Sequence, residues 1–296
     1  MPVKQIRAFP HSQNLLSRAV CGIPLAAFIA CFCLVSAHTQ PPAPTPADSP
    51  PALPDAPAPA TAGPPAACHG GAVTLACLPR NFLCDQAAIW TSPARLRPRD
   101  IGWLAPLALA SSAAIATDHR AMTQVVSQDP GFNNANVTAS NVLIGVWIAA
   151  PVALYGYGHF QQDDHAREAG LLGGESMLDG VVVELALKQV FRRERPSVDD
   201  ARGRFFQSNV GFDSSFPSSH AVVAWSAAAA LAAEYRSPWT QIGLYSAATS
   251  VSFTRVLGRE HFPSDVLAGS SVGWLIGHYV VKKHRKSREL GARSRE

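Results

Sequence analysis

Residues 216–234 read FPSSHAVVAWSAAAALAAE, a short polar turn followed by a long apolar stretch rich in alanine. Ser218 and Ser219 are residue types that cap the start of a helix, and alanine is the best helix former. We therefore predict a helix over 220–234. Its small side chains suit close packing against neighbouring helices.

Segments of the same kind recur along the second part of the chain. Turn signals such as Asp129-Pro130-Gly131, Arg195-Pro196 and Ser237-Pro238 separate them, and β-branched alternation is scarce. The pattern predicts an all-α fold, a six-helix bundle over residues 101–281. The predicted helices are 101–116, 141–158, 170–192, 220–234, 240–257 and 265–281.

The charge of the chain is concentrated at its ends. Of the formal net charge of +4 over 296 residues, residues 1–37 contribute +3 and residues 282–296 contribute +5, so the body over 38–281 carries −4. An acidic body argues against nucleic acid as a partner.

The first 37 residues resemble an export signal. A basic region precedes an apolar run from Ala19 to Val35, and Val35-Ser36-Ala37 has the small-x-small pattern of a cleavage site. The alternative is an uncleaved anchor helix. We predict an exported protein, periplasmic or membrane-associated.

Three further regions flank the predicted bundle. Residues 38–66 form a Pro/Ala-rich linker, with eleven Pro and eight Ala over 41–66. Residues 67–100 form a lead-in that holds Cys68, Cys77 and Cys84, which permits one disulfide and leaves one thiol. Residues 282–296 form a basic tail.

The relation of the bundle to a membrane is open at this stage. The predicted helices contain about 15–18 apolar residues, short to marginal for a bilayer. If the leader exports the chain and all six helices span, the basic tail ends outside, against the positive-inside tendency. We therefore favour an exported domain close to the membrane.

Three short stretches gather the polar residues of the bundle. Lys188 and Arg195 lie seven residues apart, two helical turns, in the first stretch. Ser218, Ser219 and His220 form the second, at a helix start whose free N–H groups bind anions. Taken alone, the first stretch is explained by a Glu184–Lys188 pair and a solvated helix end, and the second by an ordinary serine cap.

The third stretch runs from Thr254 to Asp265. Arg255 offers a planar donor fork that suits phosphate oxygens, and Asp265 is close enough in sequence to orient the imidazole of His261. Taken alone, Asp265 is a helix cap and His261 a loop histidine. Together, the three stretches predict an oxyanion site with a nucleophile and an acid beside it.

The order K-x6-R-P, P-S-x-H and R-x5-H-x3-D resembles the type 2 phosphatidic acid phosphatase superfamily, which includes bacterial class A acid phosphatases and vanadium haloperoxidases. The motifs cover residues 188–265. The resemblance implies an all-α fold and a metal-independent phosphatase that forms a phosphohistidine. The expected substrate is a phosphomonoester or diphosphate, on a lipid or on a small molecule.

The resemblance also implies the role of each residue. His261 is the expected nucleophile, Asp265 orients it, and His220 is the general acid. No cofactor or metal is expected, and Asp163-Asp164-His165 is interpreted as a polar loop. The expected ligands of the phosphoryl oxygens are Lys188, Arg195, Ser218, Ser219 and Arg255.

Two departures from the family pattern are present: Ser219 replaces the usual Gly, and Thr254 replaces the usual Ser. Two alternatives also remain. The same ligands bind vanadate in a haloperoxidase, and an inactive helical membrane-associated protein would keep the motif only as an anion site.

Overall fold

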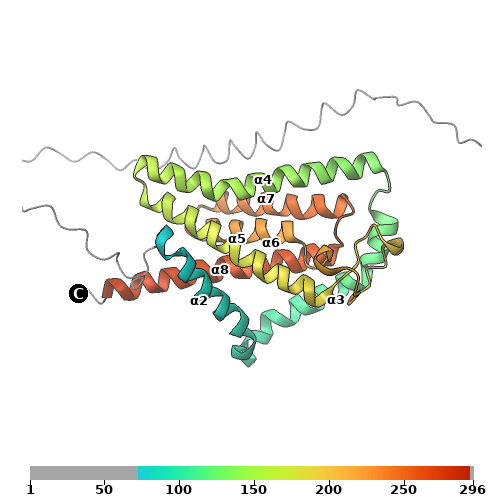
Figure 1. Ribbon diagram of the computed structural model, residues 1–296, viewed down its shortest axis with the longest axis horizontal. Coiled ribbons are helices and arrows are strands. Elements are labelled where there is room, and N and C mark those ends of the chain that lie inside the picture. The colour runs from blue at the N-terminus through green and yellow to red at the C-terminus, as the bar shows by residue number, and fades with distance from the viewer. Residues whose placement is uncertain (1–72, 294–296) are drawn as a thin grey trace, which may run out of the picture. The chain divides into compact units, whose positions relative to one another are not determined.

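The computed structural model describes residues 73–293 (Figure 1). The predicted leader over 1–37, the linker over 38–66 and Cys68 lie outside the described residues. Within residues 73–293 the regular structure is helical, and no strand occurs. The all-α prediction is confirmed.

Seven α-helices rather than six lie in this part of the chain. They are α2 (Leu78–Thr91), α3 (Ile101–Arg120), α4 (Pro130–Gln161), α5 (Asp164–Phe191), α6 (Ser219–Glu234), α7 (Pro238–Leu257) and α8 (Pro263–Arg293).

The two predicted helices 220–234 and 240–257 match α6 and α7 within two residues at each end. The prediction missed α2 and made α3, α4 and α8 too short. Asp163-Asp164-His165 is not a loop, because Asp163 caps α5 by accepting from the N–H of Ala166 at 3.1 Å. The first part of the basic tail continues α8 as far as Arg293.

Helix α6 is the centre of the bundle and contacts α4, α5, α7 and α8. Its alanines Ala227 to Ala230 are fully buried. Gly269, Gly273 and Gly277 of α8 face it, and a Cβ at Gly273 would lie 2.4 Å from the carbonyl oxygen of Val222. These three glycines let the two backbones touch, and the contact fixes the start of α6 against the start of α8.

Figure 1 shows α4, α5, α6, α7 and α8 running along the long axis of the bundle, with α2 crossing α8. The loop over 192–218 lies at one end, where α5 and α7 end and α6 and α8 begin. The basic C-terminal part of α8 lies at the other end. The ends of the helices near the loop thus bring the three predicted polar stretches together.

Two stretches are long and apolar enough to cross a membrane. They are residues 98–125, with a mean hydropathy of 1.2, and residues 130–161, with a mean hydropathy of 1.8. In the most apolar part of residues 98–125 no residue is buried in the bundle, and in that of residues 130–161, 28% of the residues are buried. Both stretches therefore turn most of their apolar surface outward.

Two cysteines fall within the described residues. Cys77 is disulfide-bonded, and its partner lies outside residues 73–293. Cys84 of α2 is a free, exposed thiol. One bonded and one free cysteine agree with the predicted single disulfide, whereas the identity of the partner stays a prediction.

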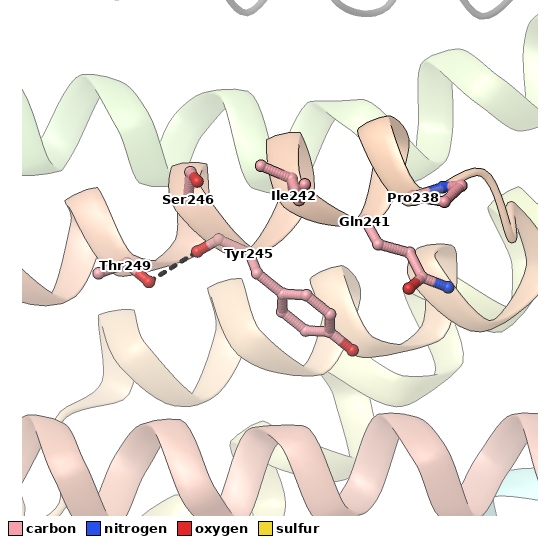
Figure 2. A pocket seen from close by; sticks show the side chains of 6 residues that line it. All are labelled: Pro238, Gln241, Ile242, Tyr245, Ser246 and Thr249. Atoms are coloured by element: carbon pink, nitrogen blue, oxygen red, sulfur yellow. Dashed lines mark hydrogen bonds between the residues drawn. The ribbon is translucent and has the colours of Figure 1, made fainter.

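A hollow of about 570 Å³ lies along α7 (Figure 2). Thr249 there donates to the carbonyl oxygen of Tyr245 at 2.7 Å. The lining contains no histidine and no charged side chain, and it begins at Pro238, at the far end of α7 from Arg255. This hollow therefore offers no imidazole or charged group for acid–base catalysis. The lining residues are Pro238, Gln241, Ile242, Tyr245, Ser246 and Thr249.

Candidate active site

The eight predicted site residues lie together at the end of the bundle near the loop. Lys188 is on the last turn of α5, His220 on the first turn of α6, and Arg255 on the last turn of α7. Arg195 follows α5, and His261 and Asp265 flank the start of α8. Four helix ends thus converge on one site.

His261 is held by the loop that precedes α6. Its Nδ1 lies 2.7 Å from the carbonyl oxygen of Ser215 and 3.8 Å from Oδ2 of Asp265. Because both neighbours are acceptors, the neutral ring carries its proton on Nδ1. The lone pair is therefore on Nε2, as a nucleophile requires.

Asp265 makes its close contacts elsewhere. Its Oδ1 accepts from Arg193 at 2.6 Å, and its Oδ2 accepts from the backbone N–H of Phe262 at 2.8 Å. The hydrogen bond to His261 that was expected from Asp265 comes instead from the Ser215 carbonyl. Asp265 therefore fixes the backbone beside His261, through the N–H of Phe262.

Sequence reasoning missed Arg193, which is 1% exposed. Its guanidinium donates to Asp265, to Oδ2 of Asp118 at 2.7 Å and to Oγ of Ser264 at 2.7 Å. It also lies 4.1 Å from the ring centroid of Phe262. No motif or spacing indicates this network, since Asp118 is 75 residues away on α3.

Lys188 is buried, and its Nζ lies 3.0 Å from Oε1 of Glu184. The same oxygen accepts from Oγ of Ser219 at 2.7 Å. The Glu184–Lys188 pair is therefore present, but inside the site and not on a solvated helix face. Glu184 holds a cation and a hydroxyl beside the start of α6.

Arg195 and Arg255 share a carboxylate. Oε2 of Glu260 accepts from Arg195 at 2.7 Å and from Arg255 at 3.3 Å. Arg255 also donates to Oγ of Ser140 on α4 at 3.1 Å. An anion that binds both arginines would compete with Glu260 for them.

Two buried polar atoms of the site have no hydrogen-bond partner within the described residues: Nε of Arg255 and Oγ of Ser218. A buried donor without a partner is costly, so such atoms point to a ligand. Ser218 also precedes α6 without using its hydroxyl as a cap, and the free N–H groups of the first turn add positive potential. All these donors suit an oxyanion.

His220 is neutral at neutral pH. Burial is the largest effect, and together with Arg255, His261, Lys188 and Arg195 it lowers the pKa of His220 to about 3. Its Nε2 lies 3.3 Å from Oδ1 of Asn141 on α4. Burial, followed by the same three cations, also lowers the pKa of His261 well below its ordinary value. The site is thus poised for a negative ligand.

The two departures from the family pattern have local explanations. Ser219 donates to Glu184, a bond that a glycine could not make. Thr254 donates to the carbonyl oxygens of Ser250 and Val251 at 2.9 Å, within its own helix. Neither hydroxyl is an unpaired donor toward the site.

The model of the PAP2 superfamily matches residues 170–289. This segment is a PAP2 superfamily domain. The PAP2 domain contains all eight predicted site residues, whereas α3, α4 and the first six residues of α5 precede it. Asp118, Ser140 and Asn141, which contact the site residues, therefore lie outside the matched segment.

Two known proteins are similar to this chain. A lipid A 1-phosphatase from Porphyromonas gingivalis is 38% identical over 65 residues, which are 21% of this chain and 15% of that protein. A crystal structure of a transmembrane PAP2 type phosphatidylglycerolphosphate phosphatase from Bacillus subtilis is 22% identical, with a TM-score of 0.45. That match covers 71% of this chain and 96% of the other.

Replacing Arg193 should destabilise the protein strongly. Arg193→Gln leaves the buried carboxylates of Asp118 and Asp265 without their cation, so we expect a loss of about 3–5 kcal/mol in the free energy of unfolding. Chemical denaturation in detergent measures the loss. Arg204→Gln is the control, because the side chain of Arg204 is 55% exposed and the loss of its ion pairs should lower stability much less than the loss of Arg193. Equal losses in the two variants would contradict the prediction.

Proposed function

We propose that the protein is a phosphatase that hydrolyses a lipid phosphomonoester or diphosphate through a phosphohistidine on His261. The observation that carries the proposal is a set of three groups on one site: Nε2 of His261, which carries the lone pair of the ring, and Oγ of Ser218 and Nε of Arg255, which have no hydrogen-bond partner within the described residues. A nucleophilic nitrogen, a free hydroxyl and a free guanidinium N–H suit a phosphoryl group. Membership of the PAP2 superfamily supports the same reaction.

The first half of the reaction follows from the two histidines. Nε2 of His261 attacks phosphorus, and the bond from phosphorus to the leaving oxygen breaks. His220 donates a proton to that oxygen. Lys188, Arg195 and Arg255 stabilise the charge on the other phosphoryl oxygens. Nδ1 of His261 keeps its proton, which the Ser215 carbonyl and Asp265 stabilise as the ring becomes cationic.

In the second half, the now neutral His220 accepts a proton from water. The oxygen of that water attacks phosphorus, the bond from phosphorus to Nε2 breaks, and inorganic phosphate leaves. Each step uses groups of this chain alone, so the proposal requires no catalytic metal.

A groove beside the site supports a lipid substrate. It has a volume of about 530 Å³ and starts at Pro263, two residues from His261. Along α8 it reaches Leu275, about 18 Å away at the rise of a helix. Trp103, Trp225 and Trp274 line it together with aliphatic side chains. Its length and apolar walls suit an acyl chain whose phosphate is held by the cations.

The outward apolar side chains of α3 and α4 support insertion in a membrane. They form the outer face of the two stretches that are long enough to span it. These exposed side chains are Trp103, Leu109, Ile115, Phe132, Val142, Ile148, Val152, Tyr157 and Phe160.

We place the active site outside the cytoplasm. Lys282, Lys283, Arg285 and Lys286 lie toward the C-terminal end of α8, more than about 25 Å along the helix from Asp265. The positive-inside tendency puts that end in the cytoplasm, with the site on the other side. In this orientation the chain enters α3 from the cytoplasmic side. A cleaved leader would instead export residues 38–100, so this orientation differs from the one that the predicted export signal implies.

Replacing the nucleophile should abolish activity. We expect His261→Ala to lower kcat/KM for a lipid phosphate by more than about 1000-fold, measured by phosphate release from mixed micelles. His159→Ala, a histidine near the far end of α4, is the control and should match the parent.

Two outcomes would contradict this mechanism. Equal activity of His261→Ala and the parent would favour an inactive or differently working protein. Bromide oxidation by peroxide with vanadate, in the absence of ester hydrolysis, would favour a haloperoxidase.

Binding of an anion should draw a proton into the site. A dianion offsets the cations that depress the pKa of His220, so the raised pKa lets the ring take up about one proton. Tungstate is a suitable probe because it stays a dianion at neutral pH. Calorimetry in buffers of different ionisation enthalpy measures the uptake, and affinity should fall as pH rises. His220→Gln should bind tungstate with little uptake, and unchanged uptake in that variant would contradict the role of His220.

A large side chain in the groove should lower activity on long-chain lipids more than activity on small phosphate esters. Ser271→Trp places an indole between the walls of the groove, so the ratio of kcat/KM for a long-chain lipid phosphate to that for p-nitrophenyl phosphate should fall about tenfold or more. Ser250→Trp, on the exposed side of α7, is the matched control. A ratio that does not change in Ser271→Trp would remove the groove from the proposal.

Thiol labelling in intact cells tests the orientation. In a Cys84→Ser background, Phe212→Cys in the loop at the active-site end should react with a membrane-impermeant maleimide, because Phe212 is 66% exposed. Lys286→Cys, at the basic end, should react only after permeabilisation. The reverse pattern would place the site in the cytoplasm.

A further inference from the structure

A second polar cluster is buried far from the active site, among α2, α5 and α8. It contains Asp85, Glu175 and His284, which are at most 4% exposed. Glu175 lies thirteen residues before Lys188 on α5, about 20 Å along that helix, and His284 lies nineteen residues after Asp265, about 28 Å along α8. The proposed reaction uses none of these groups.

The ligand atoms of the cluster are arranged as a cation requires. One atom from each of Asp85, Glu175 and His284 lies within 4.8 Å of the other two. Ligands around a tetrahedral zinc ion at about 2.0–2.2 Å are roughly 3.3–3.6 Å apart, so small side-chain rotations bring the three atoms onto one ion. His284 Nε2 already lies 3.1 Å from Oε1 of Glu175.

The unpaired oxygens are the independent sign of a ligand. Oδ2 of Asp85 and Oε2 of Glu175 are buried and have no hydrogen-bond partner within the described residues, and the same holds for Oδ2 of the neighbouring Asp179. Acceptors buried without donors are costly, and for carboxylates the cost is largest. The existing partners, Lys283 on Asp85 and Gln86 on Asp179, leave one oxygen of each carboxylate unused.

The charge of the cluster points to a divalent ion. The carboxylates of Asp85, Glu175 and Asp179 face one ammonium, that of Lys283, and an imidazole that is neutral when it binds a metal. A charge of +2 balances them. A set of one nitrogen and several oxygens without sulfur suits Zn²⁺ or Mn²⁺ and does not suit the ions that prefer thiolates.

We propose that Asp85, Glu175 and His284 bind a divalent transition-metal ion that ties α2 to α5 and α8. The site is structural, because it lies at the opposite end of the bundle from His261. It is independent of the proposed phosphatase reaction.

Metal uptake by the full chain tests the site. The protein, purified in detergent and stripped with a chelator, is dialysed against Zn²⁺ or Mn²⁺, and its metal content is measured by mass spectrometry. We expect one ion per chain and a higher Tm for the loaded protein. His284→Gln and Glu175→Gln should each weaken binding by at least about 100-fold. His278→Gln, on the same helix but outside the cluster, is the matched control and should bind as the parent does.

Co²⁺ gives a second readout that needs no variant. Its visible absorption bands in the stripped parent should report nitrogen and oxygen ligands, so the proposal stays testable if His284→Gln does not fold. A folded, stripped parent that takes up no stoichiometric metal, or a His284→Gln protein that binds as tightly as the parent, would overturn the proposal. Phosphate release by the same metal-free parent is measured separately, so failure of the metal site and failure of the proposed reaction are distinguishable.

Discussion

The buried guanidinium of Arg193 holds the active-site end of the bundle together. It binds Asp118 at the end of α3, Ser264 and Asp265 at the start of α8, and it belongs to the loop that leaves α5. A charge that is 1% exposed is tolerated only because each of these groups satisfies it. The backbone on both sides of His261 is fixed as a result. The proposed nucleophile, His261, therefore depends on a buried cation that has no part of its own in the proposed reaction.

The cations that face the site are held differently. Glu184 pairs with Lys188, and Glu260 lies between Arg195 and Arg255, so carboxylates of the protein keep these side chains in place before an anion arrives. Arg255 still keeps one unpaired N–H, and Ser218 keeps an unpaired hydroxyl. Such preorganised cations and donors stabilise developing charge effectively, because they need little reorganisation during the reaction.

The two ends of the bundle differ in the kind of charge that they bury. At the active-site end, burial and an excess of cations lower the pKa of His220, whereas the cluster around Glu175 has an excess of carboxylates. The Ala-rich helix α6 and the glycines of α8 lie between them and bring the backbones into contact. This apolar centre keeps the two charged groups apart, so each can bind a ligand of the opposite charge.

The sequence alone predicted the residues of the candidate site and determined part of the fold. Helices α6 and α7 were predicted closely, because apolar runs bounded by Ser-Pro and Pro-Ser turns are local signals. Helix α2 was missed and α3 and α4 were made too short, because polar and small residues at their ends blur the apolar pattern. The eight site residues were predicted from the types and spacing of the motif residues, because one reaction needs these residue types together.

Only the tertiary structure decided how those residues are supported. The contacts that support the site join segments that are distant in sequence. The Ser215 carbonyl accepts from Nδ1 of His261, and Arg193 donates to Asp265. Ser140 and Asn141 reach the site from α4. Such contacts depend on how helices pack, and neither residue type nor spacing encodes which of several arginines becomes buried. The sequence thus determined which groups can act on a phosphoryl oxygen, and packing decided which of them are free to do so.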